Sequence, residues 1–157
     1  MAEELWIDKI RGRVAIAGVG DLRRGDDGAG PAVARLLAEA GTPGVFDCGS
    51  APEIETWRIR EYAPETVVFV DAVDFGGAPG ELAFLEVDQL RSEGFDAHRA
   101  PLRLTMQYLE LELGVKCYLL GIQPADVRFG APMCQEVKRT VDSVVGIMQN
   151  PDVFGEG

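Results

Sequence analysis

A glycine-rich stretch, GVGDLRRGDDGAGP over residues 18–31, carries the adjacent aspartates Asp26 and Asp27 at the end of the apolar run VAIAGV. Such loops bind phosphate when they supply backbone N–H groups and positive charge, but this one supplies carboxylates. Arg23 stands where a dinucleotide fingerprint has its third glycine, and GDDGAG stands where a P-loop has its lysine and hydroxyl. The loop therefore suits a cation better than a phosphate. The alternative is that Asp26 or Asp27 caps the helix that follows.

Two further polar residues are expected near this loop. Asp71 ends the apolar run VVFVDA, and His98 lies in FDAHRAPL, just before a helical segment. Ligands of open α/β sheets bind beyond the carboxyl ends of the strands, which is where Asp27, Asp71 and His98 would meet. Two carboxylates and an imidazole suit a metal of borderline hardness, such as nickel or zinc. The spacing is not a recognised chelate pattern, so Asp71 as a partner of turn amides and His98 as a helix cap remain open.

Other catalytic arrangements have less support in the sequence. A single histidine excludes the HExxH motif, and Ser50 in CGSAP lacks the second glycine of a nucleophile elbow. Cys48 or Cys134 could form a thiol dyad with His98, but cysteines are more often small core residues. Three cysteines without a CxxC pair, Cys117 being the third, argue against a disulfide framework and a cysteine-built zinc site.

The elements that position these residues alternate along the chain. Buried strands are predicted at 13–19 and 66–73, further strands at 44–49 and 115–122, and an edge strand within 76–87, whereas helices are predicted at 29–41, 51–63, 100–114 and 131–149. This alternation predicts an α/β fold, with an open, mainly parallel sheet of about five strands between two layers of helices. We expect one domain over residues 1–157, a mobile tail from about 150, and packing roles for Trp6 and Trp57.

The overall charge restricts the partners. The chain has 157 residues with 26 acidic and 15 basic side chains, a net charge of −11, which disfavours binding to nucleic acid or to anionic membranes. The sequence has neither an apolar run of about 18 residues nor a signal-peptide pattern. A cytoplasmic protein is therefore expected.

Several motifs together resemble those of the [NiFe]-hydrogenase maturation proteases, endopeptidases that trim the hydrogenase large subunit after nickel insertion. The resemblance covers almost the whole chain. It rests on GVGDLRRGDDGAGP, DCGSAPE (47–53), FVDAVDFGGAPGE (69–81), HRAPL (98–102), LLGIQP (119–124) and GAPMCQEV (130–137). GDDGAGP, GSAPE and GIQP look closest to the branch that serves formate-hydrogenlyase-type or related energy-converting hydrogenases. Two positions depart from the family pattern: Asp21 replaces the usual asparagine, and Cys48 replaces the usual glycine of DGG.

The resemblance implies a twisted sheet between helices and an aspartyl-type endopeptidase whose metal belongs to its substrate. Asp27, Asp71 and His98 would meet nickel already held by the large-subunit precursor, and Asp47 would be needed for cleavage. The implied catalytic residues are thus Asp27, Asp47 and Asp71. Another divalent metal in the isolated protein remains open, as do three roles for Asp26: helix cap, support of Asp27, or exchange with it as ligand.

Two other functions fit the same predicted metal ligands. A nickel chaperone or docking module would bind the metal without hydrolysis, and a metallohydrolase acting on small amides would carry its own metal. Neither accounts for the match of several motifs. The two departures could also alter the site, because Asp21 adds charge and Cys48 could crowd the backbone or add a soft ligand.

Overall fold

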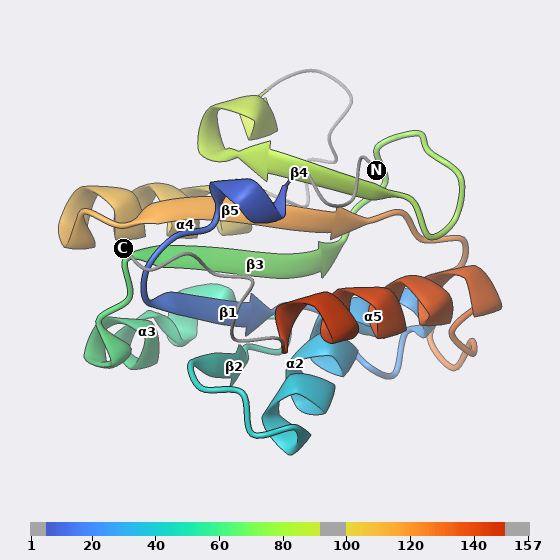
Figure 1. Ribbon diagram of the computed structural model, residues 1–157. Helices are drawn as coiled ribbons and strands as arrows, with labels where there is room; N and C mark the ends of the chain where they lie inside the picture. Colours follow the sequence, from blue (N-terminus) through green and yellow to red (C-terminus); the bar gives the residue numbers. More distant parts are fainter. Residues whose placement is uncertain (1–5, 92–99, 150–157) are drawn as a thin grey trace.

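A five-stranded sheet forms the centre of the computed structural model, which describes residues 6–91 and 100–149. The strand order is β2-β1-β3-β5-β4, with β1 at Val14–Gly18, β2 at Val45–Asp47, β3 at Thr66–Ala72, β4 at Leu82–Glu86 and β5 at Lys116–Ile122 (Figure 1). The first three and β5 run parallel, while β4 pairs with β5 in the antiparallel direction. The predicted α/β class and mainly parallel sheet are confirmed.

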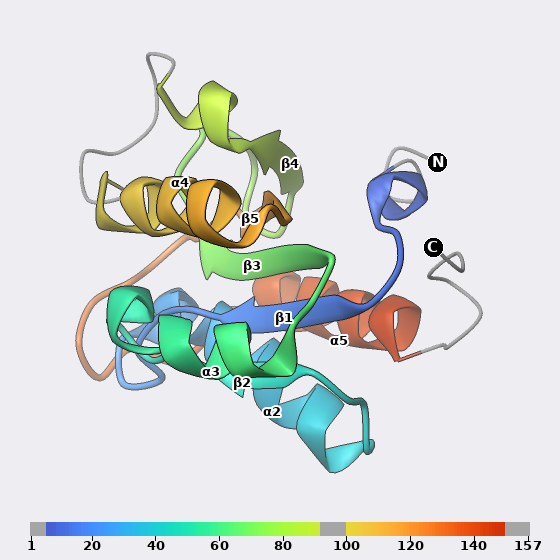
Figure 2. The same ribbon diagram turned by 90° about the vertical axis from the view of Figure 1, so that its left-hand side faces the viewer.

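Helices cover both faces of the sheet, as predicted. Figure 2 shows α3 and α4 on one face and α2 and α5 on the other. The α-helices are α2 (Ala29–Glu39), α3 (Thr56–Tyr62), α4 (Ala100–Leu113) and α5 (Gln135–Met148), and the 3-10 helices are η1 (Ile7–Lys9), η2 (Gly25–Gly28), η3 (Pro52–Ile54) and η4 (Val87–Arg91). None of the helices in the described ranges has the length and apolar character of a membrane span.

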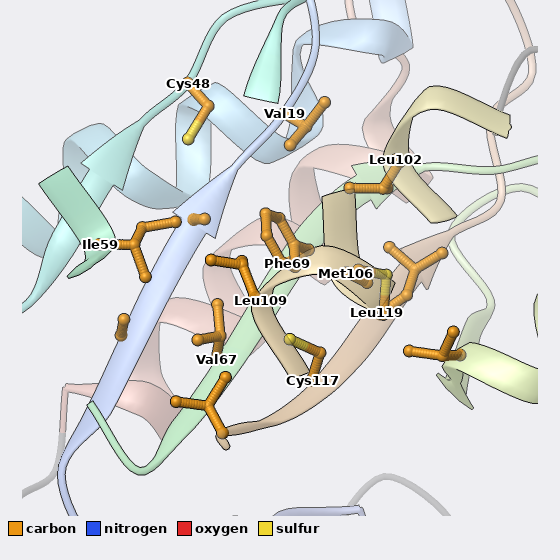
Figure 3. Packing of buried hydrophobic residues seen from close by; sticks show 14 of the residues in the cluster. Val19, Cys48, Ile59, Val67, Phe69, Leu102, Met106, Leu109, Cys117 and Leu119 are labelled. Carbon is orange, nitrogen blue, oxygen red and sulfur yellow. The ribbon is translucent and has the colours of Figure 1, made fainter. Parts of the chain in front are cut away.

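Alternate residues of the buried strands face the two helical layers. One set packs against α3 and α4 around Phe69, as Figure 3 shows, and the other packs against α2 and α5 around Val70. All seven residues of β3 are buried because this central strand has a helical layer on each side. Trp6 is buried and stacks on Phe84, as expected. The packing role predicted for Trp57 is wrong, because 58% of this residue is exposed.

The strand order reverses at β1. The chain passes from β1 through α2 to β2 on one side, whereas β3 lies on the other side of β1. Gly18 at the end of β1 pairs with Asp47 of β2 and with Val70 of β3. Such a reversal opens a ligand-binding crevice at the carboxyl ends of the strands, the edge to which the arrowheads of β1 and β3 point in Figure 1.

Candidate active site

The glycines of the first loop let α2 begin in direct contact with the sheet. A Cβ atom on Gly30 would lie 2.2 Å from the carbonyl oxygen of Val70 and 2.3 Å from that of Val19. A Cβ atom on Gly20 would lie 2.0 Å from the carbonyl oxygen of Asp27, and the φ of Gly20 is +140°. Only glycine fits such close backbone approaches. The loop is therefore glycine-rich because α2, η2 and the ends of β1 and β3 pack together at the point where the strand order reverses.

Asp27 and Asp71 come to the same edge of the sheet from neighbouring strands. Asp27 lies in η2, which follows β1 and contacts β3, and its Oδ2 accepts a hydrogen bond from the N–H of Asp21 at 2.9 Å. Asp71 is the penultimate residue of β3 and is fully buried, with an exposed fraction of 0%. His98, the third predicted ligand, lies outside the described residues. Within residues 6–91 and 100–149, no three His, Cys, Asp or Glu side chains form a group that could hold a metal ion.

Asp26 points into the protein and joins two distant segments. Its Oδ2 accepts hydrogen bonds from the N–H groups of Ala125 at 2.8 Å and Asp126 at 3.0 Å, and its Oδ1 accepts one from the N–H of Cys134 at 2.8 Å. Burial opposes ionisation of this carboxyl, but the backbone N–H donors outweigh it and hold the pKa of Asp26 below its usual value. Asp26 therefore fastens η2 to the connection between β5 and α5.

The alternative of helix capping by Asp26 or Asp27 is wrong for α2. The N-cap of α2 is Gly28, and the helix has no side-chain cap. The Asp26 oxygens accept hydrogen bonds from the connection between β5 and α5, and one Asp27 oxygen accepts a hydrogen bond from the N–H of Asp21. The two adjacent aspartates thus have different surroundings, and the exchange of Asp26 with Asp27 as a ligand would require breaking three hydrogen bonds of the Asp26 carboxylate.

Asp47 ends β2 and lines an open hollow of about 370 Å³. Its Oδ2 lies 3.3 Å from Nε of Arg35 on α2, and its Oδ1 accepts the N–H of Gly49 at 3.2 Å. The hollow is bounded by the loops after β1 and β2, and its lining also includes Leu22 and Ser50. Asp27 and Asp71 do not line this hollow, so Asp47 occupies a separate, more solvent-accessible part of the same edge.

Gln123 organises the loop that follows Asp71. Its Oε1 accepts hydrogen bonds from the N–H groups of Phe75 at 2.9 Å and Gly77 at 3.0 Å, and its Nε2 donates to Asp74 at 3.0 Å. The side chain is buried at the end of β5. One buried amide therefore fixes the course of the chain as it leaves β3.

Comparison with known proteins agrees with this arrangement. The family model described as "Hydrogenase maturation protease" matches residues 31–150. The chain is 41% identical over 130 residues to the hydrogenase 3 maturation protease of Escherichia coli K12, covering 80% of this chain and 82% of that relative. This chain belongs to the hydrogenase maturation proteases.

Solved structures of such proteases have the same fold. The [NiFe] hydrogenase maturation protease HycI from Thermococcus kodakarensis superposes with a TM-score of 0.85 and 29% identity over 98% of each chain. The endopeptidase HycI from Escherichia coli superposes with a TM-score of 0.78 and 36% identity over 87% of this chain and 89% of that one. The family and fold expected from the sequence motifs are confirmed.

The two departures from the family pattern are accommodated by this maturation protease. Asp21 binds Arg23 through hydrogen bonds to its Nε and terminal nitrogen, both at 3.0 Å, and these bonds hold the pKa of Asp21 below its usual value. Cys48 is buried in the core beside Ile59 and Val19 (Figure 3), and burial raises its pKa to about 12. Arg23 therefore offsets the added charge, and Cys48 remains a neutral thiol, poorly suited to act as a soft ligand or nucleophile.

The remaining cysteines have no features of a nucleophile either. Cys117 is buried in the core and Cys134 is half-buried at the N-cap of α5. Burial raises the pKa of both thiols. The expectation of small packing residues is confirmed for Cys48 and Cys117.

The sequence does not indicate how three residues shape this edge: the inward contacts of Asp26, the loop contacts of Gln123 within GIQP, and the pairing of Arg35 with Asp47. The strand pattern predicts Asp27 and Asp71 at the carboxyl edge, whereas Asp47 is implied by the family resemblance. The partners of Asp26 and Gln123 lie about 50 to 100 residues away, which local patterns do not encode.

Proposed function

We propose that this maturation protease cleaves the C-terminal extension from the precursor of a [NiFe]-hydrogenase large subunit, in the cytoplasm, after nickel has been inserted. Family membership supports hydrolysis of a hydrogenase precursor, since the named relatives are maturation proteases or endopeptidases. The observation that carries the proposal is the position of Asp27 and the buried Asp71 at the end of neighbouring strands, where the strand order reverses.

Asp27, Asp71 and His98 would contact nickel that the precursor already holds. Carboxylate oxygens and an imidazole suit an ion of this hardness. The fully buried carboxylate of Asp71 lies near the end of β3, at the edge where the cation of the precursor would be placed. Each such contact strengthens binding of the nickel-loaded precursor but not of the nickel-free form. Differential binding of this kind provides the maturation checkpoint.

Cleavage consumes one water molecule. Its oxygen adds to the scissile carbonyl carbon, the C–N bond breaks, and protons end on the new amine as the carboxylate forms. Asp47 would accept the proton of that water, which its carboxylate can reach because it lines a hollow open to solvent. Nickel in the substrate would either polarise the carbonyl as a Lewis acid or only position the peptide.

Cleavage of a nickel-loaded precursor by matched variants tests these roles. Asp47→Asn should lower kcat by at least about 100-fold if Asp47 is the base. Asp27→Asn and Asp71→Asn should remove the preference for the nickel-loaded form, whereas Asp142→Asn, exposed on α5, should behave as wild type. Normal turnover by Asp47→Asn would eliminate it as a base. Nickel binding without any change in precursor mass would favour the chaperone alternative.

A further inference from the structure

The loops that follow β1 and β5 form one rigid unit beside the site. Besides the three hydrogen bonds to the Asp26 carboxylate, the N–H of Asp26 donates to the carbonyl of Asp126 and the N–H of Gly130 donates to that of Arg23, both at 2.8 Å. A Cβ atom on Gly25 would lie 2.3 Å from the Asp126 carbonyl oxygen, so the two backbones also touch directly. Residues 20–28 and 124–134 are therefore held in a fixed relation.

Three large apolar side chains stand exposed on these joined loops. Leu22 is 42% exposed, Val127 41% and Phe129 68%. The guanidinium of Arg23 lies 5.7 Å from the centre of the Phe129 ring, a cation–π contact that links the loops at the surface. We call Leu22, Val127 and Phe129 the paired-loop surface.

The charges on the joined loops nearly cancel. Arg23 pairs with Asp21 at 3.0 Å, and Arg128 pairs with Asp126 at 2.7 Å. With Arg24, Asp26 and Asp27, residues 20–28 and 124–134 hold four acidic and three basic side chains, so they are close to neutral in a chain whose net charge is −11. An apolar, locally neutral area in an acidic protein is suited to an apolar area of another protein.

We propose that the paired-loop surface is where the folded large-subunit precursor docks, independently of its nickel. The inference rests on the proposed function. The surface is continuous with the site, because Leu22 also lines the hollow that contains Asp47 and Asp27 lies on the same loop as Leu22. A protein that brings its scissile bond to the hollow would lie against Leu22, and the joined loops extend this contact to Val127 and Phe129.

The rigid loops explain how a small surface could contribute to binding. Ordering loops on association opposes binding, so a surface that is already fixed loses less free energy when the partner arrives. The buried Asp26 carboxylate fixes this one before any partner is present. Docking would then position the extension, and the contacts to nickel would decide whether it is cut.

A comparison of two exposed aromatic residues tests the proposal. Phe129→Ser and Trp57→Ser remove residues of similar exposure, but Trp57 lies on α3 and is not part of the joined loops. Steady-state cleavage of nickel-loaded precursor gives KM and kcat, and titration with nickel-free precursor gives Kd. Phe129→Ser should raise both KM and this Kd about tenfold, as expected for the loss of an aromatic anchor. Trp57→Ser should leave both unchanged, with thermal unfolding confirming that each variant is folded.

The outcomes separate this inference from the proposed function. Unchanged KM and Kd in folded Phe129→Ser, or an equal loss in Trp57→Ser, would overturn the docking surface while leaving cleavage established. Failure of the wild-type protein to cleave would count against the proposed function alone, because the Kd for nickel-free precursor reports docking without cleavage.

Discussion

Asp26 and Asp27 are adjacent and chemically identical, yet the fold gives them different tasks. Asp26 is fully buried and accepts three backbone hydrogen bonds from the connection between β5 and α5, whereas Asp27 is half-buried at the edge of the site. A carboxylate committed to three donors is not available to a ligand without unfastening the loop. The proposed contact with nickel therefore belongs to Asp27, and Asp26 holds Asp27 in place.

Asp26→Ala should destabilise the protein by about 1–3 kcal/mol, because three part-buried N–H donors lose a charged acceptor that is itself fully buried. Urea unfolding at neutral pH measures this difference. Asp88→Ala is the control, since Asp88 is exposed and should change stability by no more than about 0.5 kcal/mol. Equal stabilities for the two variants would contradict the fastening role of Asp26.

Cys48 should be inert despite its place beside Asp47. With a pKa raised to about 12 by burial, the thiol stays protonated at pH 8 and should resist iodoacetamide in the native protein, becoming reactive on unfolding. Cys48→Ala should retain kcat within about twofold, because no step of the proposed cleavage uses the sulfur. Rapid labelling of Cys48 in the folded protein, read by peptide mass, would revive the thiol alternative.

Residue types alone indicated part of the site. Asp27 and Asp71 stand at the ends of apolar runs, so the carboxyl edge of a parallel sheet was predictable for both. The inward direction of the Asp26 side chain was not predictable, because its partners Ala125, Asp126 and Cys134 lie about 100 residues away in the sequence. His98 remains a prediction from the resemblance, outside the described residues.

At the scale of elements, the site depends on how closely α2 approaches the sheet. Gly30→Ala should destabilise the protein by about 1–3 kcal/mol, because its Cβ would meet the backbone oxygens of Val70 and Val19, which no side-chain rotation relieves. Gly146→Ala on α5 is the matched control. With open space around it and an ordinary helical backbone, this change should stabilise by about 0.5–1 kcal/mol. Thermal unfolding of both variants measures these changes in stability. A Gly30→Ala variant as stable as the wild type would contradict the close packing of α2 on the sheet.

The sequence predicts best those elements whose apolar residues form a clear run or repeat and are buried in the fold. β1, β3 and β5 coincide within a residue or two with the predicted apolar runs at 13–19, 66–73 and 115–122. The prediction of one continuous helix at 51–63 is wrong. The segment forms two helices, η3 and α3, and Glu55, with φ −96° and ψ 3°, separates them. α5 begins later than predicted because Cys134 is extended, with ψ 159°, where Asp26 binds its N–H. Tertiary contacts thus decided the boundaries that periodicity could not.

At the scale of the whole molecule, one sheet edge combines three proposed functions. The buried carboxylate of Asp71 and the neighbouring Asp27 would detect nickel, the hollow with Asp47 would hold the peptide, and the paired-loop surface would bind the precursor. The edge joins them because β1, β2 and β3 all end there. On the proposed function, the carboxylates of this acidic chain would recognise a cation carried by another protein, and the aspartates of its glycine loop would serve that contact in place of the donors of a phosphate site.

The most direct measurement is the intact mass of the cognate large-subunit precursor after incubation with this protein, with and without nickel loaded beforehand. The account predicts loss of a C-terminal fragment from the nickel-loaded precursor alone, with the nickel-free form unchanged. Cleavage of both forms at equal rates would contradict the checkpoint, and cleavage of neither would contradict the protease function itself.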